Sequence, residues 1–286
     1  MDQLLQCALE AAERGGKVAC EYFLRGEEVP KVQKSDGSYV TEADIKVEDE
    51  IAKCLRSGSG VDCIIAEEGG LSGANDADRY WIVDPIDGTR AFMYGVPLFG
   101  TLIALVQEGV PVVGVISYPA IQLTIFAGPG SGCFERAGDV TRRIMVDDQA
   151  IPLNEAVVSI SGIHGLNLSA YNDEAYSPLE YLSKECGDLV FINDCYQHGM
   201  VCKGRIHCAI DTIMKPWDIA AIIPCIVGAG GCFSSLNGSR DNVLQSGSLI
   251  SASNEQLLDQ VVGAFRLRDG DGVSRTMHSS SPPLLI

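Results

Sequence analysis

WIVDPIDGT, residues 81–89, is the segment from which the fold and the chemistry of the chain are most directly inferred. Its apolar start predicts a buried strand that ends at Asp84, and the proline that follows fixes the next backbone angle. Asp87 stands three positions after Asp84, in a turn closed by Gly88. Two carboxylates and the Ile86 carbonyl can then converge on one point, and such oxygen donors suit Mg²⁺. A solvated acidic turn is the alternative interpretation.

Two other segments also place an acid at the end of a predicted element. CIIAEEGG (63–70) predicts a strand that leads to Glu67 just before two glycines. KPWDIAA (215–221) places Asp218 at the start of a helix that follows a strand and a turn. Strand and helix ends that each present an acid can meet in a single cleft. The three segments together favour the metal-site interpretation.

The charge balance argues against several classes of partner. The chain has 286 residues, with 21 Lys+Arg against 38 Asp+Glu, and thus a formal net charge of −17. Such a surplus of acids disfavours nucleic acid and anionic membranes, which proteins bind through clustered Lys and Arg. It disfavours a phosphate-bearing substrate equally, unless a multivalent cation reverses the local sign.

The ends and the cysteines of the chain bear on its compartment. The chain does not open with a basic stretch followed by an apolar run, and no window holds eighteen uninterrupted apolar residues. We therefore expect a cytoplasmic protein without a membrane span. The eleven cysteines include no CxxC pair, so we expect mostly buried thiols rather than zinc ligands or disulfides.

The apolar pattern predicts two helices, then an antiparallel meander, then alternating strands and helices. Residues 2–23 predict an amphipathic helix with a weak point at Gly15 and Gly16. A polar loop is expected at 29–40. DIAAIIPCIVGAGG (218–231) predicts one helix that ends at glycines.

This order of elements predicts two subdomains that share a cleft. Residues 1–148 form the expected N-terminal α+β subdomain and residues 149–266 the C-terminal α/β subdomain. The Ser/Pro-rich tail, 267–286, is predicted to be disordered. Thr41 and Asp44 have the spacing of a capping pair at the start of the second helix.

Two segments carry a resemblance to a known family. WIVDPIDGT (81–89) and KPWDIAAIIPCIVGAGG (215–231) are similar to the two signatures of the inositol monophosphatase superfamily, the Mg²⁺-dependent, Li⁺-sensitive phosphomonoesterases. Order and composition agree from about residue 1 to 265. The resemblance implies a layered αβαβα sandwich, commonly assembled as a homodimer.

The resemblance also implies a set of metal ligands. Glu67, Asp84 and the Ile86 carbonyl would hold one Mg²⁺. Asp84, Asp87 and Asp218 would hold a second. Some family members bind a third, weaker ion, to which Glu67 would contribute through water. The resemblance thus implies two or three Mg²⁺ ions per subunit.

Other residues match the catalytic and phosphate-binding positions of the family. Asp44 and Thr89 match the pair that orients and deprotonates the attacking water, and with Glu67 they are the candidate catalytic residues. The backbone N–H groups of Gly88 and Thr89 would receive phosphate oxygens at a helix start. Lys34 occupies a loop similar to one that carries a metal-site lysine in the family.

The segment INDCYQHGMVCKGRIHCAIDTIMKPWD (192–218) bears on the substrate. Its Asp-x-Tyr start at Asp194, followed by Gly199, resembles the histidinol-phosphate phosphatase branch. Because histidinol phosphate carries an amine cation, Asp194 and Asp211 would help to bind it. The branch often has Glu where this chain has Asp211, and Asp194 is alternatively a helix N-cap. We interpret His198 as a structural residue.

The expected function is therefore hydrolysis of a small phosphorylated alcohol, with L-histidinol phosphate as the preferred substrate in histidine biosynthesis. The nearest alternative keeps the chemistry but takes myo-inositol 1-phosphate or a range of sugar and nucleotide phosphates. An alternative of another class is a non-catalytic metal- or phosphate-binding regulator. The complete set of acids argues against a regulator that has lost its activity.

Overall fold

The computed structural model describes residues 3–25, 30–35, 37–74, 77–147, 149–161 and 178–266, and the tail predicted to be disordered lies outside these ranges. The helices are α1 (Gln3–Leu24), α2 (Glu42–Ser59), α3 (Thr89–Met93), α4 (Pro178–Glu185), α5 (Asp194–Cys202), α6 (Pro216–Ala220), α7 (Ile222–Gly228) and α8 (Glu255–Arg266). The first ten strands are β1 (Lys31–Gln33), β2 (Tyr39–Thr41), β3 (Ile64–Ala66), β4 (Gly70–Ser72), β5 (Arg79–Asp87), β6 (Gly100–Gln107), β7 (Val110–Tyr118), β8 (Leu123–Gly128), β9 (Gly132–Ala137) and β10 (Val140–Ile144). The later strands are β11 (Val157–Ile160), β12 (Asp188–Phe191), β13 (Cys208–Asp211), β14 (Cys232–Ser234) and β15 (Leu249–Ala252).

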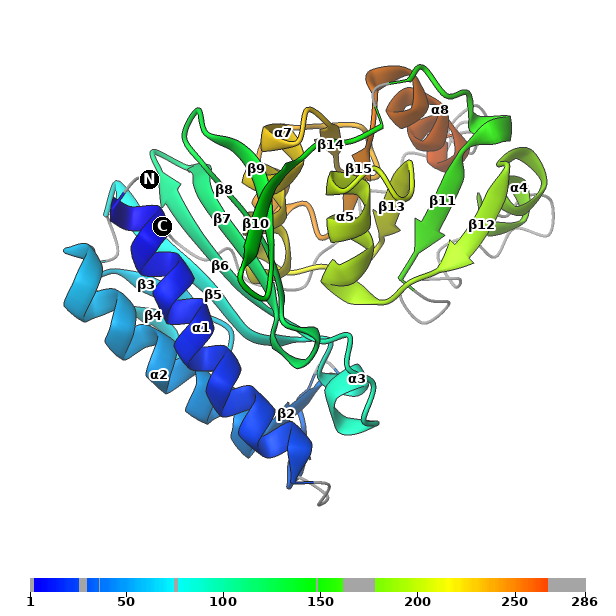
Figure 1. Cartoon of the computed structure of the whole chain (residues 1–286). Helices are drawn as coiled ribbons and strands as arrows, with labels where there is room; N and C mark the ends of the chain where they lie inside the picture. Colours follow the sequence, from blue (N-terminus) through cyan, green and yellow to red (C-terminus); the bar gives the residue numbers. More distant parts are fainter. Residues whose placement is uncertain are drawn as a thin grey trace.

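Two large sheets alternate with three layers of helices (Figure 1). The first sheet has the strand order β10-β9-β8-β7-β6-β5-β3-β4, and the second has the order β12-β11-β13-β15-β14. α1 and α2 cover the outer face of the first sheet, whereas α4 and α8 cover the outer face of the second. α5, α6 and α7 lie between the two sheets. The predicted αβαβα sandwich is therefore confirmed.

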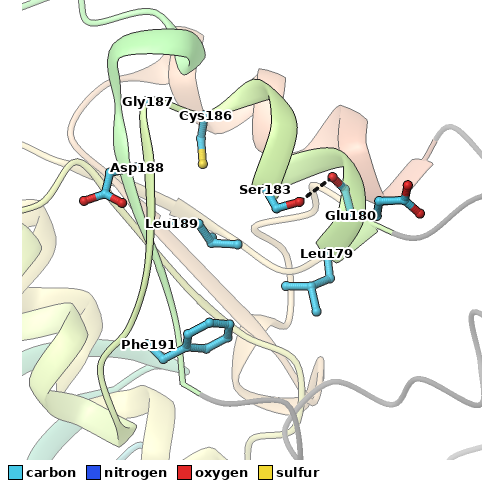
Figure 2. A pocket seen from close by; sticks show the side chains of 8 residues that line it. All are labelled: Leu179, Glu180, Ser183, Cys186, Gly187, Asp188, Leu189 and Phe191. Carbon is cyan, nitrogen blue, oxygen red and sulfur yellow. Dashed lines mark hydrogen bonds between the residues drawn. The ribbon is translucent and has the colours of Figure 1, made fainter.

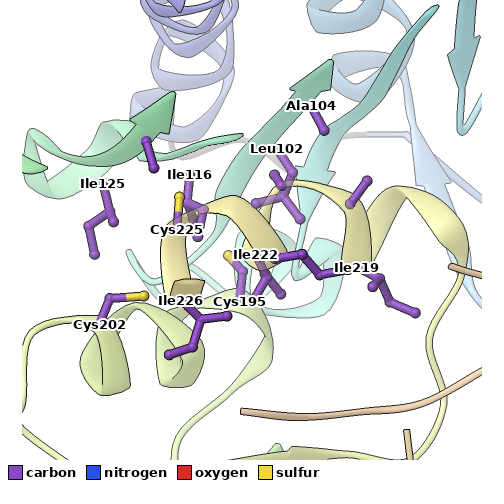
Figure 3. Packing of buried hydrophobic residues seen from close by; sticks show 14 of the residues in the cluster. Leu102, Ala104, Ile116, Ile125, Cys195, Cys202, Ile219, Ile222, Cys225 and Ile226 are labelled. Atoms are coloured by element: carbon purple, nitrogen blue, oxygen red, sulfur yellow. The ribbon is translucent and has the colours of Figure 1, made fainter. Parts of the chain in front are cut away.

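The middle helices join the two sheets into one apolar core. Ile219 of α6 and Ile222 and Ile226 of α7 pack against side chains of the first sheet, among them Leu102 and Ile116 (Figure 3). All five side chains are at most 1% exposed. Fully buried aliphatic side chains each contribute about 1.5–3 kcal/mol to folding. This packing fixes the start of α6, and hence Asp218, relative to the first sheet.

One prediction about helices is confirmed and one is wrong. The amphipathic helix expected over 2–23 is α1, which continues through Gly15 and Gly16, where the absence of a side chain allows close packing. A Cβ at Gly15 would lie 2.7 Å from Cγ1 of Ile51, and one at Gly16 would lie 2.9 Å from Cβ of Pro119. The single helix expected over 218–231 is divided into α6 and α7. The proline in the first turn of α7 has no N–H to donate to the end of α6, so the helix is interrupted there.

The polar loop expected at 29–40 contains two short strands. β1 and β2 pair antiparallel, with Val32 opposite Val40, and Gly37 adopts a φ of 85° between them. Glycine adopts this left-handed conformation without a steric penalty, so it favours the tight return of the chain. Within the described ranges, no helix combines the length and the apolar character that a membrane span requires.

Sheet membership changes in the middle of the chain. Every strand of the eight-stranded sheet precedes residue 145, and every strand of the five-stranded sheet follows residue 156. We propose that the boundary between the subdomains 1–148 and 149–266 lies at this change. Because the middle helices pack on the first sheet, the two subdomains share a core.

Candidate metal centre and active site

A bulge in β5 brings Asp84 and Asp87 together. β5 does not end at Asp84, as the sequence predicts, but continues to Asp87. Asp84 pairs with Leu102 and Asp87 with Gly100, so three steps along β5 face two steps along β6. In a regular strand, residues three apart point to opposite faces of the sheet. The extra residue of the bulge changes that alternation, and both carboxylates reach the same cluster.

Asp218 completes a cluster of three carboxylates. Its Oδ2 accepts a hydrogen bond of 2.7 Å from the backbone N–H of Lys215, which holds it at the start of α6. One oxygen from each of Asp84, Asp87 and Asp218 lies within 4.8 Å of the other two. Asp84 is 2% exposed, and its Oδ1 is buried without a hydrogen-bond partner in the described part of the chain. An unpartnered buried carboxylate oxygen is costly, so this cluster suits a bound cation.

The raised pKa values of the three acids also indicate that the cluster suits a bound cation. Burial, and then the charges of Glu67 and Asp87, raise the pKa of Asp84 well above its ordinary value. Burial and the charge of Asp218 raise the pKa of Asp87 to about 7, although hydrogen bonds from Cys195 act to lower it. Burial also raises the pKa of Asp218 to about 7. A divalent cation offsets this repulsion, and a set of hard oxygen donors fits Mg²⁺.

Glu67 lies outside the three-carboxylate cluster, but its charge raises the pKa of both Asp84 and Asp218. Its Oε1 accepts a hydrogen bond of 2.8 Å from Lys34 Nζ. The same ammonium donates to Oε1 of Glu68 at 2.6 Å. The structure thus brings Lys34, between β1 and β2, to the acid expected to hold a metal ion.

Asp44 is fully buried and uses one of its oxygens to cap α2. Oδ2 accepts hydrogen bonds from the backbone N–H and the hydroxyl of Thr41, at 2.7 and 2.6 Å, so the predicted capping pair is confirmed. Oδ1 is buried and has no hydrogen-bond partner among the described residues. Burial raises the pKa of Asp44 to about 6, although the hydrogen bonds from Thr41 oppose the rise.

Thr89, the expected partner of Asp44, makes a different contact. Its hydroxyl donates to the carbonyl oxygen of Ile86 at 3.1 Å. Within the described ranges, no hydrogen bond joins Thr89 to Asp44. The carbonyl of Ile86 belongs to the bulge between Asp84 and Asp87, so Thr89 helps to hold the backbone that carries the two acids.

Gly88, Asp194 and Cys195 lie beside Asp87. Gly88 is the N-cap of α3 with a φ of 79°, and a Cβ there would lie 2.8 Å from Oδ2 of Asp194. The backbone N–H of Cys195 donates to Oδ2 of Asp87 at 2.8 Å, so the start of α5 fixes that carboxylate. Burial, and then the charges of Asp87 and Asp211, raise the pKa of Asp194 well above its ordinary value.

Asp211, at the end of β13, is 8% exposed. Its Oδ2 accepts a hydrogen bond of 2.7 Å from Gln197 Nε2 and lies 3.2 Å from His198 Nε2. Sequence reasoning missed Gln197, although two adjacent polar residues in a largely apolar helix were a signal. The N-cap of α5 is Asn193, so the alternative role of Asp194 as N-cap is wrong.

A separate groove of about 680 Å³ lies between α4 and β12 and contains none of the candidate residues (Figure 2). Apolar side chains and peripheral polar groups line it: Leu179, Glu180, Ser183, Cys186, Gly187, Asp188, Leu189 and Phe191. The acids in this lining do not form a cluster of possible metal ligands. The three-carboxylate cluster is therefore the better candidate for the active site.

Comparison with known proteins places the chain among phosphatases. The profile of the inositol monophosphatase family matches residues 1–268. A histidinol-phosphatase from Chlorobaculum parvum is 36% identical over 87% of this chain and 92% of its own length. An inositol-1-monophosphatase from Mesorhizobium japonicum is 33% identical over 92% of this chain and 96% of its own. The crystal structure of the extragenic suppressor protein suhB from Bartonella henselae has a TM-score of 0.83, with 25% identity over 93% of this chain and 99% of that one.

The family uses Mg²⁺, which agrees with the buried carboxylates of this chain. A cation also offsets the negative charge that would otherwise repel a phosphate. The match covers both sheets and all the acids of the site. The chain belongs to the inositol monophosphatase family and is a metal-dependent phosphomonoesterase.

Proposed function

We propose that this phosphomonoesterase prefers an ester whose alcohol carries a positive charge, and that its substrate is L-histidinol phosphate. The observation that carries this proposal is the position of Asp194 and Asp211. Neither belongs to the three-carboxylate cluster, but both lie close to it: Asp194 lies against Gly88, next to Asp87, and the charge of Asp211 raises the pKa of Asp87. Two acids that lie beside a metal centre and are not among its proposed ligands favour a cationic leaving group.

The resemblance and the donor set together support the proposed metal ligands. Glu67, Asp84 and the Ile86 carbonyl would hold one Mg²⁺, and Asp84, Asp87 and Asp218 would hold another. A third, weaker ion would use Glu67. When bound, Mg²⁺ offsets the charge of the phosphate and makes water a stronger acid.

Asp44 is the proposed proton acceptor of the reaction. Its Oδ2 is occupied by Thr41, so Oδ1 is the oxygen that remains for a proton from the attacking water. A pKa near 6 keeps most of the carboxylate ionised at neutral pH and still basic enough to take a proton. Thr89 would orient the water through its hydroxyl, which in this structure contacts Ile86.

The phosphate would be held at the start of α3. Gly88 has no side chain, so the backbone there can approach a phosphate oxygen closely. The backbone N–H groups of Gly88 and Thr89 are the proposed donors. Asp194 lies against Gly88, and this contact supports a role for the acid beside the proposed phosphate position, where it would face the alcohol.

Phosphate release from a substrate panel tests this proposal. L-histidinol phosphate, myo-inositol 1-phosphate, a hexose phosphate and a nucleoside monophosphate are compared in Mg²⁺ buffer, with and without a chelator. We expect the highest kcat/KM for histidinol phosphate and no turnover after chelation. Equal or better turnover of inositol 1-phosphate would favour the second candidate, which the 33% identity to an inositol-1-monophosphatase supports.

The homodimer implied by the family resemblance stays a prediction. Light scattering of the purified protein during size-exclusion chromatography measures its mass directly. We expect twice the chain mass of 30.5 kDa, and a single-chain mass would contradict the expectation.

A further inference from the structure

Among the described residues, the hydrogen bonds to the side chain of Asp211 all reach one oxygen. Gln197 Nε2 donates to Oδ2 at 2.7 Å, and His198 Nε2 lies 3.2 Å from the same atom. Gln197 also donates to the carbonyl of Ile210, which fixes the orientation of its amide. In the described part of the chain no donor reaches Oδ1, and the side chain of Asp211 keeps 10% of its surface exposed. One carboxylate oxygen is therefore held and the other is available.

His198 connects Asp211 to the second sheet. Its ring is fully buried, and Nδ1 contacts the hydroxyl of Ser251 on β15. An ionised carboxylate only accepts hydrogen bonds, so Nε2 of His198 must donate to Asp211. In a neutral imidazole Nδ1 then accepts, and the hydroxyl of Ser251 must donate to it. When Asp211 is ionised and the imidazole is neutral, the hydrogen bonds therefore run in one direction, from Ser251 through His198 to Asp211.

This chain of contacts fixes the orientation of the Asp211 carboxylate. Asp211 ends β13, and its backbone alone does not determine which oxygen points out of the core. Two donors on Oδ2, from adjacent residues of α5, remove that freedom.

We propose that His198, supported by Ser251 and Gln197, is a positioning residue that orients Asp211 so that Oδ1 receives the cationic group of the substrate. His198 would then determine specificity without touching the substrate. This inference rests on the proposed function, because it assumes an ester with a positively charged alcohol. A structural role alone would instead affect neutral and cationic esters alike.

A matched pair of variants separates these roles. His198→Gln keeps an amide donor at about the position of Nε2, whereas His198→Asn is too short to reach Asp211. Both place a polar amide in the same buried space, so they differ chiefly in the contact with the carboxylate. The readout is the ratio of kcat/KM for L-histidinol phosphate to that for myo-inositol 1-phosphate, with KM and kcat measured separately.

We expect His198→Asn to lower this ratio about tenfold, through a higher KM for histidinol phosphate, because a hydrogen bond to a charged group is lost. His198→Gln should restore the ratio to within about threefold of the wild type, the smaller loss reflecting an imperfect amide donor. Ser251→Ala, which removes one remote hydroxyl, provides a milder variant if His198→Asn does not fold, and it should lower the ratio in the same direction.

Three outcomes would overturn the inference in distinguishable ways. In the first, the wild-type kcat/KM ratio is well above one and stays unchanged in His198→Asn and Ser251→Ala. That result would refute the positioning role and leave the proposed substrate preference intact. Equal losses for both esters in His198→Asn and His198→Gln would also refute it, since they indicate a structural role. A wild-type ratio near one would refute the proposed substrate preference, and the inference would fall with it.

Discussion

Substitution of Gly88 by alanine tests whether the proposed phosphate position lies against Asp194. Gly88 has a φ of 79°, and its missing Cβ would lie 2.8 Å from Oδ2 of Asp194. An ordinary contact requires at least 3.4 Å, so the carboxylate must move by about 0.6 Å. The left-handed backbone adds a cost of roughly 1–2 kcal/mol for any residue with a Cβ. Gly88→Ala therefore combines a strain on stability with a displacement in the cleft.

Gly95 provides a matched control for the backbone strain. It follows α3 with a φ of 73°, and a Cβ there would meet no atom within 4 Å apart from its chain neighbours, so Gly95→Ala carries the conformational cost without the clash. Both variants should lose about 1–2 kcal/mol of unfolding free energy in chemical denaturation. Only Gly88→Ala should also lose activity, by about 10²-fold in kcat/KM for histidinol phosphate, because a small displacement at the reacting centre is costly.

Two results of comparing Gly88→Ala with Gly95→Ala would contradict the proposed phosphate position. If Gly88→Ala and Gly95→Ala retain the same kcat/KM, the space beside Gly88 is not part of the cleft, and the assignment of phosphate binding to the start of α3 is wrong. A loss of activity in Gly95→Ala as large as that in Gly88→Ala would show that strain in α3, and not contact with Asp194, controls turnover.

Three further predictions concern the metal centre. Asp87 and Asp218 have a pKa of about 7 in the folded protein without metal, raised by burial, so the stability that they contribute is present below pH 4 and is lost as pH rises through 7. Thermal unfolding should therefore show a larger gain from Mg²⁺ at pH 8 than at pH 5, and equal gains would contradict this expectation. Asp44→Asn should lower kcat by about 10²–10⁴-fold with little change in Mg²⁺ affinity, and a kcat within tenfold of the wild type would exclude Asp44 as the proton acceptor. Tyr118→Phe removes a donor to the carbonyl of Cys195, whose N–H holds Asp87, so calorimetry should show a Mg²⁺ affinity several-fold weaker; an unchanged affinity would disprove this coupling.

Two acids of the candidate site follow strong local signals in the sequence. Glu67 comes directly after the short apolar strand β3, and Asp218 lies in the first turn of α6, directly after a turn. Thr41 and Asp44 follow a capping pattern that depends on only four consecutive residues. Such features are local, so a single chain without relatives is enough to place them.

Contacts between distant segments could not be predicted in this way. The bulge that brings Asp84 and Asp87 together depends on pairing with β6, and the periodicity of the apolar residues contains no sign of it. The hydrogen bond from Cys195 to Asp87 joins residues 108 positions apart. Gln197 and His198 become meaningful only because α5 packs beside the end of β13. The contacts that hold these acids in place thus depend on tertiary packing, which the sequence pattern does not reveal.

The interruption between α6 and α7 was not predicted for a different reason. The proline at position 224 was visible in the sequence, and a proline beyond the first helical turn interrupts a helix. The apolar pattern across 218–231 outweighed that signal.

Calorimetric titration of the metal-free protein with MgCl₂ tests the central claim, that Asp84, Asp87 and Asp218 form a Mg²⁺ site, most directly. The wild type is compared with Asp218→Asn and with Asp188→Asn, a control that removes one exposed acid elsewhere. We predict that Asp218→Asn weakens Mg²⁺ binding at least about tenfold, since a charged ligand is lost, and that Asp188→Asn binds like the wild type. Equal Mg²⁺ affinity in all three proteins would contradict the claim.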